Sequence, residues 1–311
     1  ARWIIDPNNP LTARVAVNRY WQMIFGAGIV LTSEDFGTQG DRPSHQALLD
    51  YLAVDFVESG WNVKHLIGMM VTSASYRQAS VQSPQIIESD PDNRLLSHAP
   101  RQRLAAESVR DHVLAVSGLL VDTRGGPGVQ PYQPAALFGR NAIGSSNASF
   151  KQGSGDDLYR RSLYTYWKRQ IPAANMRILG ADGRNSCRTR RELTNTPLQA
   201  LVLLNGPQFV EAARALGTKA MNEGGKSVES RLAYAFRLST SRAATPPELA
   251  ILVTEFNDRL GEFEKDLPRA KAYLAGGGAL IVAPDSDPAQ LAAYAAVASL
   301  ILNLDESISK S

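Results

Sequence analysis

The sequence predicts a mainly α-helical fold with many helices, and three observations support this prediction. Apolar residues recur at helical spacing in most of the chain, for example at Leu48, Leu49, Leu52 and Phe56. Three segments share one kind of helix start: a capping residue is followed directly by proline, and Glu or Gln stands three positions after the cap. The capping residues are Thr196, Thr245 and Asp287. The best strand candidate is short, and it predicts a small β element near residues 160–170.

Composition limits the classes of protein to which the chain can belong. Its 311 residues suit one large domain or two ordinary ones, and a hydrophobic share of 44% with 20% charged residues is typical of a globular protein. A net charge of +3 argues against a nucleic-acid partner, which requires a concentrated basic face. No run reaches the roughly 18 apolar residues that a membrane-spanning helix needs. The single cysteine excludes an internal disulfide.

The first 121 residues predict four helices. One ends near Gly26 or Gly28, one begins at Ser44, one is capped by Asn62, and a long one covers about residues 101–120. Residues 80–100 contain three prolines and lose helical periodicity, which predicts a connector.

Residues 122–157 are rich in glycine and proline and predict a long irregular excursion. We therefore expect a sub-boundary within 122–157 in one domain that covers residues 1–311. This boundary would separate an N-terminal helical part, 1–121, from a C-terminal helical part, 158–311. The first residues, 1–7, read like the interior of a longer protein, so we expect the chain to be a fragment. The helix that starts after Thr196 carries an apolar run, so we expect burial on nearly all its sides.

Common catalytic and cofactor motifs are absent from the sequence. It contains no C-x-x-C-H, G-x-G-x-x-G, P-loop, H-E-x-x-H or G-x-S-x-G pattern. With four histidines and one cysteine, we expect no metal site and no cofactor in this chain.

An arginine-rich segment, residues 140–191, carries eleven basic and three acidic residues, a net charge of +8. Guanidinium groups bind carboxylate, sulfate or phosphate in a bidentate manner, and aromatic rings in the segment can stack on sugar rings or on guanidinium groups. This predicts an anionic-ligand or acidic-glycan surface, with the candidate residues Arg160, Arg161, Tyr164, Lys168, Arg169 and Arg191. The alternative is that these arginines pair with acids elsewhere in the chain.

Three residues are candidates for catalysis. Glu107 and Asp111 share a predicted helix face with Arg103 and Arg110. That face is a solvated salt-bridged surface, a structural ion network against the arginine-rich segment, or a general acid–base pair. Cys187 lies among arginines, which favour a thiolate, but all four histidines are far upstream; an inert cysteine is the alternative.

The sequence resembles the planctomycete-type domain-of-unknown-function family 1553. The resemblance rests on Val17-Asn18-Arg19-Tyr20-Trp21-Gln22, Arg42-Pro43-Ser44-His45, Asp92-Asn93-Arg94-Leu95-Leu96 and Thr194-Asn195-Thr196-Pro197. Further blocks follow the family's order, at residues 9–14, 25–26, 35–37, 39–40, 60–61, 73–78, 107, 110–111, 159–164, 191, 198–205 and 302–306.

The resemblance implies the C-terminal domain of a large exported protein, located in the periplasm or at the cell surface. Its partners would be the upstream domains of the same polypeptide, of which one is often cytochrome-c-like and holds haem. The leading hypothesis is an accessory or interaction module with an anionic-ligand or acidic-glycan surface. The alternatives are a hydrolase-type enzyme acting on a polysaccharide or sulfated substrate, and a structural partner of the upstream haem domain. The family supplies no assigned reaction.

Overall fold

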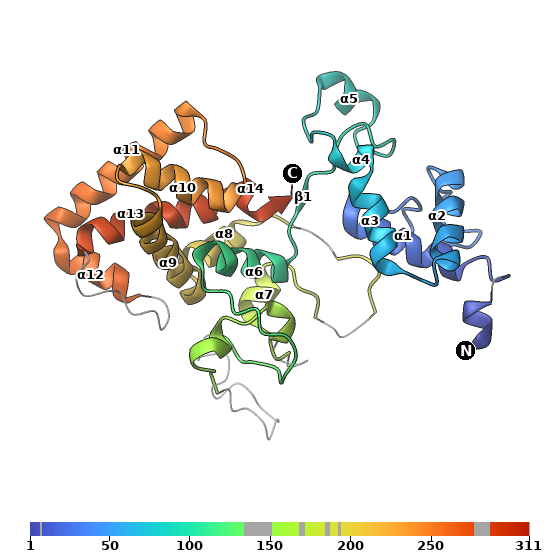
Figure 1. Cartoon of the computed structure of the whole chain (residues 1–311), viewed down its shortest axis with the longest axis horizontal. Coiled ribbons are helices and arrows are strands. Elements are labelled where there is room, and N and C mark those ends of the chain that lie inside the picture. The colour runs from blue at the N-terminus through green and yellow to red at the C-terminus, as the bar shows by residue number, and fades with distance from the viewer. Residues whose placement is uncertain are drawn as a thin grey trace. The chain divides into compact units, whose positions relative to one another are not determined.

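A computed structural model describes residues 1–6, 8–133, 151–167, 172–183, 187–191, 194–276 and 287–310. The fold is mainly α-helical, as the sequence predicts, with a small two-stranded antiparallel sheet formed by β1 (Gln102–Arg103) and β2 (Ser309–Lys310) (Figure 1). Contacts divide the chain into two compact units. Unit 1 comprises residues 1–102, 187–190 and 309–311, and unit 2 comprises 103–186 and 191–308.

Unit 1 is built from short helices around an aromatic core. Its helices are η1 (Arg2–Ile5), α1 (Thr12–Phe25), α2 (Gln46–Glu58), α3 (Val63–Thr72), α4 (Ala74–Arg77) and α5 (Pro84–Ser89). Asn62 caps α3 as predicted, because its side-chain oxygen accepts a hydrogen bond from the His65 N–H at 3.1 Å. Trp21, Phe25, Phe56 and Leu66 are buried and hold α1, α2 and α3 together.

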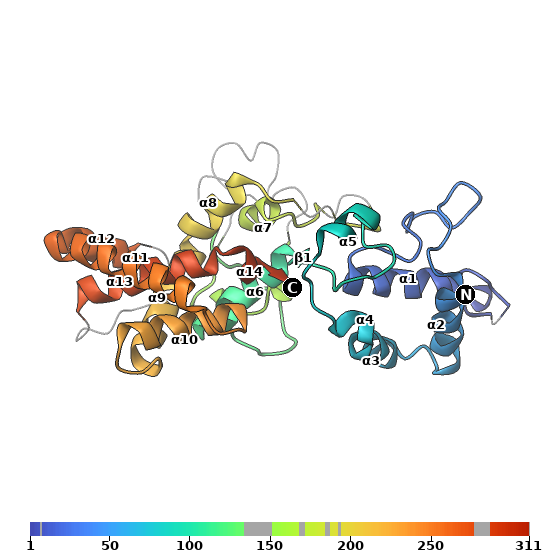
Figure 2. The ribbon, with the colours of Figure 1, turned by 90° about the horizontal axis from the view of Figure 1, so that it is seen from above.

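Unit 2 is organised around one buried helix, α13 (Pro288–Leu302). Its other helices are α6 (Ala106–Ser117), η3 (Gly155–Leu158), η4 (Ser162–Tyr164), α7 (Ala174–Ile178), α8 (Pro197–Asn205), α9 (Pro207–Glu223), α10 (Val228–Thr240), α11 (Pro246–Lys265), α12 (Leu267–Ala275) and α14 (Asp305–Ile308). Helices α9, α10, α11 and α12 pack on α13, and the view from above places α8 and α10 on opposite sides of it (Figure 2). A Cβ on Gly217 of α9 would lie 2.9 Å from the Ala295 nitrogen, so glycine permits this close helix contact.

Several predicted helix details are corrected by the structure. The long helix expected over 101–120 is shorter, because residues 101–105 are extended and α6 begins at Ala106. The N-cap of α2 is His45 rather than Ser44. Helix α8 is not buried on nearly all sides, since Leu198 and Leu201 are each 54% exposed.

The three predicted helix starts lie at the expected residues, but their hydrogen bonds differ. Thr245 and Glu248 form the reciprocal capping box at the start of α11. Asp287 caps α13 by accepting from the Ala289 N–H at 3.0 Å. Thr196 precedes α8 without a side-chain cap, and Gln199 does not complete a capping box, since its Nε2 donates to the Ile178 carbonyl at 2.9 Å.

The chain around residues 160–165 forms isolated β-bridges and no continuous strand. It forms two isolated parallel bridges, Val121 with Arg160 and Val129 with Thr165. Residues 134–150 of the predicted excursion lie outside the described residues, and its flanks at 122–133 and 151–154 contain no helix. The predicted sub-boundary at 122–157 falls within the sequence range of unit 2.

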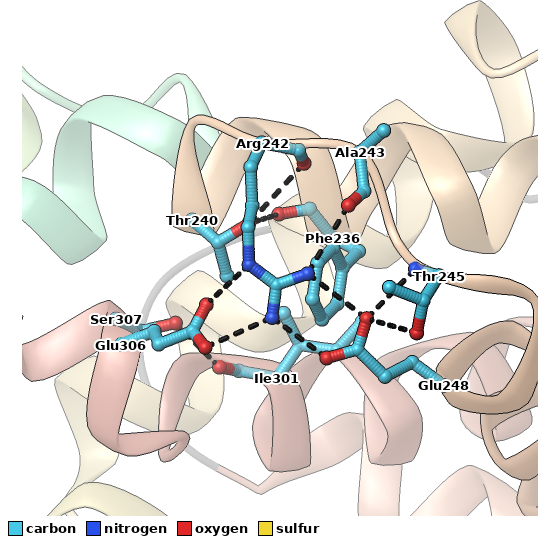
Figure 3. A network of polar contacts seen from close by, with 9 residues as sticks. All are labelled: Phe236, Thr240, Arg242, Ala243, Thr245, Glu248, Ile301, Glu306 and Ser307. Carbon is cyan, nitrogen blue, oxygen red and sulfur yellow. Dashed lines mark hydrogen bonds and ion pairs between the residues drawn. The ribbon is translucent and has the colours of Figure 1, made fainter. Parts of the chain in front are cut away.

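A polar clamp ties the loop after α10 to α11 and α14 (Figure 3). The Arg242 guanidinium donates to both carboxylate oxygens of Glu248, at 2.6 and 2.9 Å, and to both of Glu306, at 2.8 Å each. It also lies over the Phe236 ring, 4.9 Å from the centroid. These hydrogen bonds hold the pKa of Glu248 at about 2, below its ordinary value of 4.5.

The substitution Glu248→Gln should destabilise unit 2 by about 1 kcal/mol at pH 7 and lower Tm by about 2–4 °C. Since the folded-state pKa is depressed, the contribution of the carboxylate is present above about pH 4.5 and is lost as the pH falls toward 2. The Tm difference from the unsubstituted protein should therefore shrink as the pH falls from about 4.5 to 3. Thermal unfolding between pH 3 and 7 measures it, with Glu264→Gln on the same helix as control. A difference that stays constant with pH would contradict the assignment.

Candidate functional site

The arginine-rich segment folds over a buried guanidinium, that of Arg110 in α6. Arg110 is 3% exposed, and it donates to the Leu158 carbonyl at 2.8 Å, to the Arg160 carbonyl at 2.7 Å and to Gln208 Oε1 at 2.8 Å. Burial lowers the pKa of Arg110 to about 10, so the group is still charged at pH 7. The Arg110 guanidinium thus holds the backbone of residues 158–160 of the arginine-rich segment against α6.

Arg160 and Tyr164 hold a neighbouring loop. Arg160 is buried, and its guanidinium donates to the carbonyls of Pro127 at 3.0 Å, Thr123 at 3.1 Å and Gly125. It stacks on the Tyr164 ring, 4.0 Å from the centroid, and the Tyr164 hydroxyl accepts from the Gly125 N–H at 2.7 Å. The sequence analysis allowed the aromatic rings of this segment to stack on sugar rings or on guanidinium groups. The Tyr164 ring stacks on a guanidinium group.

The other predicted ligand-binding residues lie at the surface or outside the described chain. Arg161 is exposed and pairs with Asp122 at 2.6 Å, and Arg191 is exposed and pairs with Glu107 at 2.7 Å. Lys168 and Arg169 lie outside the described residues. An anionic ligand at Arg161 or Arg191 would have to displace a carboxylate that is already bound.

The catalytic candidates do not form one described cluster. Asp111 accepts from the Ser162 N–H at 2.7 Å, and Glu107 pairs with Arg191. Cys187 is exposed and belongs to unit 1, whereas Glu107 and Asp111 belong to unit 2. Glu107 and Asp111 thus both contact the arginine-rich segment, through a partly exposed ion pair and through a backbone N–H.

A fully buried carboxylate in α9 is one feature that sequence reasoning missed. Glu211 is 0% exposed and accepts from the Tyr159 hydroxyl at 2.7 Å. Burial and the neighbouring Glu211 raise the pKa of Tyr159. The signal was a glutamate on the apolar face of α9, beside Ala212 and Ala215.

Unit 1 contains a cavity of about 260 Å³. Its walls come from the end of α1 and the chain that follows it, from the residues just before α2, from residue 82 before α5, and from residues 91–102, after α5 and up to the start of β1. The lining residues with polar or aromatic side chains are Trp21, Phe25, Ser44, His45, Gln82, Asp92, Asn93, Arg94, His98, Arg101 and Gln102. Trp21 and Phe25 stack with their centroids 4.1 Å apart and form an apolar wall. The cavity thus combines two aromatic rings with many hydrogen-bonding groups.

The loop that borders the cavity is held by its own side chains. The Asp90 carboxylate is buried and accepts from the backbone N–H groups of Arg94 and Leu95, at 2.7 and 2.8 Å. Asn93 and Leu96 have φ values of +50° and +57°, a left-handed conformation that is rare for residues other than glycine. The Asn93 amide donates to the His98 carbonyl at 2.8 Å. Such strained residues persist where their surroundings fix them, and they cluster at functional sites.

His98 is buried at the edge of this loop, and both its ring nitrogens have partners. Nδ1 lies 2.8 Å from the Ala99 carbonyl oxygen, and Nε2 lies 3.2 Å from the Gln82 amide nitrogen. A carbonyl requires a donor and an amide N–H requires an acceptor, so the partners fit a neutral ring protonated at Nδ1. His98 therefore positions Gln82 at the cavity.

Sequence reasoning missed this cavity because residues 80–100 lack periodicity and were interpreted as a connector. The His45 side chain makes no capping hydrogen bond to α2, and its Nδ1 lies 3.0 Å from Ser44 Oγ. The blocks that carry the resemblance at residues 25–26, 42–45 and 92–96 all contribute to the cavity walls.

In the described part of the chain, no group of three or more His, Cys, Asp or Glu side chains is arranged to hold a metal ion. None of the described helices combines the length and hydrophobicity that crossing a bilayer requires.

The family model "PSD1: Protein of unknown function (DUF1553)" matches residues 1–256. The chain therefore belongs to this family, as its sequence blocks indicate. Comparison with curated proteins and with solved structures gives no match.

The two adjacent arginines of the arginine-rich segment should differ sharply in their effect on stability. Arg160→Ala removes three carbonyl contacts and a stacked guanidinium, and should cost about 2–4 kcal/mol. Arg161→Ala removes one exposed ion pair and should cost less than about 0.5 kcal/mol. Denaturant unfolding at neutral pH measures both. Equal losses would show that Arg160 is not the residue that holds the loop.

Proposed function

We propose that this chain is an accessory, ligand-binding module, and that its binding site is the cavity of unit 1. The observation that carries this proposal is a cavity of about 260 Å³ with a stacked aromatic pair on one wall and amide, imidazole, hydroxyl and guanidinium groups on the others. Concave sites with an apolar wall and a few convergent polar groups are the usual form of small-molecule sites.

Binding is favoured over catalysis by what the titratable groups contact. Glu107 and Asp111 are engaged with Arg191 and with the Ser162 N–H. Both nitrogens of His98 have partners, so this ring has no free lone pair for a reacting proton. These contacts suit a site that positions hydrogen-bonding groups.

The predicted anionic-ligand surface on the arginine-rich segment is the second candidate site. Its support is the exposure of Arg161 and Arg191. Against it, each of these arginines is already paired with a carboxylate, and Arg160 is turned into the unit. The cavity requires no such displacement and is the better candidate.

The proposed setting is a larger exported protein, in the periplasm or at the cell surface, with the module next to further domains of the same polypeptide. The resemblance of the sequence blocks supports this setting, including a haem-bearing cytochrome-c-like domain upstream. Cell fractionation of the full-length protein, with a haem stain, tests it; a cytosolic, haem-free protein would oppose it.

Filling the cavity should abolish binding while leaving the rest of the chain intact. We expect at least one member of a panel of monosaccharides, neutral, amino, carboxylated and sulfated, to raise Tm of the unsubstituted chain, since a ligand that binds only the folded state stabilises it. Ala27→Phe, at the cavity wall, should remove this shift.

The matched control is Ala47→Phe, an exposed position on α2 that does not line the cavity. It should keep the shift. If the panel produced no shift, or if Ala27→Phe kept it, the cavity would not be the site. A shift lost in Arg161→Ala and Arg191→Ala instead would move the site to the arginine-rich segment.

A further inference from the structure

The cavity of unit 1 carries an excess of positive charge. Among the described residues that line it, the cationic side chains are Arg94 and Arg101, and the one carboxylate is Asp92. No ion pair joins Asp92 to either arginine within the part of the chain that the structure describes. Arg101 has an interaction partner of its own, so the cation that remains for a ligand in this cavity is Arg94.

Arg94 is the residue through which this charge can act on a ligand. It is half-buried, and its backbone N–H is fixed by the Asp90 carboxylate at 2.7 Å. Its guanidinium forms no hydrogen bond or ion pair with any residue that the structure describes. In contrast, the guanidinium groups of Arg110 and Arg160 donate hydrogen bonds to backbone carbonyls. A partly desolvated guanidinium at a cavity wall, with its fork unpaired, suits a bidentate oxyanion.

A second wall also favours negative charge. Helix α2, of 13 residues, begins at the cavity, where Ser44 and His45 line it. No side chain caps this helix, so its first N–H groups have no side-chain acceptor. The helix dipole places partial positive charge at this end. This contribution supports the Arg94 argument and does not replace it.

The volume of the cavity and its amide side chains indicate the size of the ligand and its uncharged polar groups. A volume of about 260 Å³ lies just below the roughly 300–1,000 Å³ of sites for drug-sized molecules. It suits a molecule of about one sugar ring. The amide nitrogens of Gln82 and Gln102 contact His98 and the Ile24 carbonyl, and the amide oxygens of these two residues have no partner among the described residues, so they can accept hydrogen bonds from hydroxyl groups.

We infer that the cavity binds a small polyhydroxylated ligand with one anionic group, a carboxylate or a sulfate, which the Arg94 guanidinium holds. This inference rests on the proposed function, because it assigns a ligand class to the same site. The stacked Trp21 and Phe25 rings would pack against the apolar face of the ligand.

Calorimetric titration of the whole chain with matched acidic and neutral sugars tests the inference. The probes are galacturonate and galactose 6-sulfate, each compared with galactose. At least one acidic sugar should bind ten-fold or more tightly than galactose, and its affinity should fall as salt rises from 0.05 to 0.3 M.

Arg94→Met, which keeps the length and removes the charge, should abolish the ten-fold preference. Arg94→Lys should retain part of it. Arg42→Met is the control, since Arg42 is exposed and does not line the cavity. Because the Arg94 guanidinium bonds to none of the described residues, Arg94→Met should have the same Tm as the unsubstituted chain.

The two proposals fail in different ways. Equal binding of galactose and its acidic relatives, or a preference that survives Arg94→Met, would overturn the anionic class while the binding function stood. No binding by any of the three sugars, or binding unaffected by Ala27→Phe, would overturn both.

Discussion

The interaction on which unit 2 depends is the buried Arg110 guanidinium. A buried cation is tolerated only when its donors are satisfied, and Arg110 meets this condition with the carbonyls of residues 158 and 160 and with Gln208. Because these acceptors come from α9 and from the arginine-rich segment, that segment cannot detach without exposing a charge to an apolar interior. Its path over α6 is thereby fixed, and the backbone that follows is capped by Asp111 at Ser162.

The fixed path explains why Arg160 does not present its charge to solvent, although Arg161, Arg177 and Arg191 of the same segment are exposed. Once residues 158–162 lie against α6, Arg160 is buried beside the loop at 123–127, where it donates to backbone carbonyls and stacks on the Tyr164 ring. Arg161 is exposed and forms an ion pair with Asp122. Net charge along a sequence thus measures how much positive charge a segment holds, while the direction of each side chain is decided by the backbone to which it is attached.

Much of the fold could be predicted from the sequence because helix starts are local. Asn62, Thr245 and Asp287 cap helices through groups two or three residues away. The failures involve distant partners. Gln199 leaves its predicted box for the Ile178 carbonyl, and residues 101–105 are extended where β1 pairs with the chain's other end at β2. The resemblance was confirmed over residues 1–256, but the cavity was missed, since residues 80–100 carry no periodic pattern and its walls come from several separate segments.

The walls of the cavity are shaped by backbone conformations that do not depend on a ligand, and this affects the affinity with which the cavity can bind one. Gly26 ends α1 with φ of +86°, and a Cβ there would lie 2.6 Å from Gln102 Nε2, so only glycine lets the chain turn this close to the opposite wall. On that wall, the strained φ values of Asn93 and Leu96 are held by the hydrogen bonds of Asn93 and Gln78 and by the Asp90 carboxylate. None of these contacts needs a ligand. A ligand that enters therefore does not have to order the loop, and the entropy that such ordering would cost is not subtracted from its affinity.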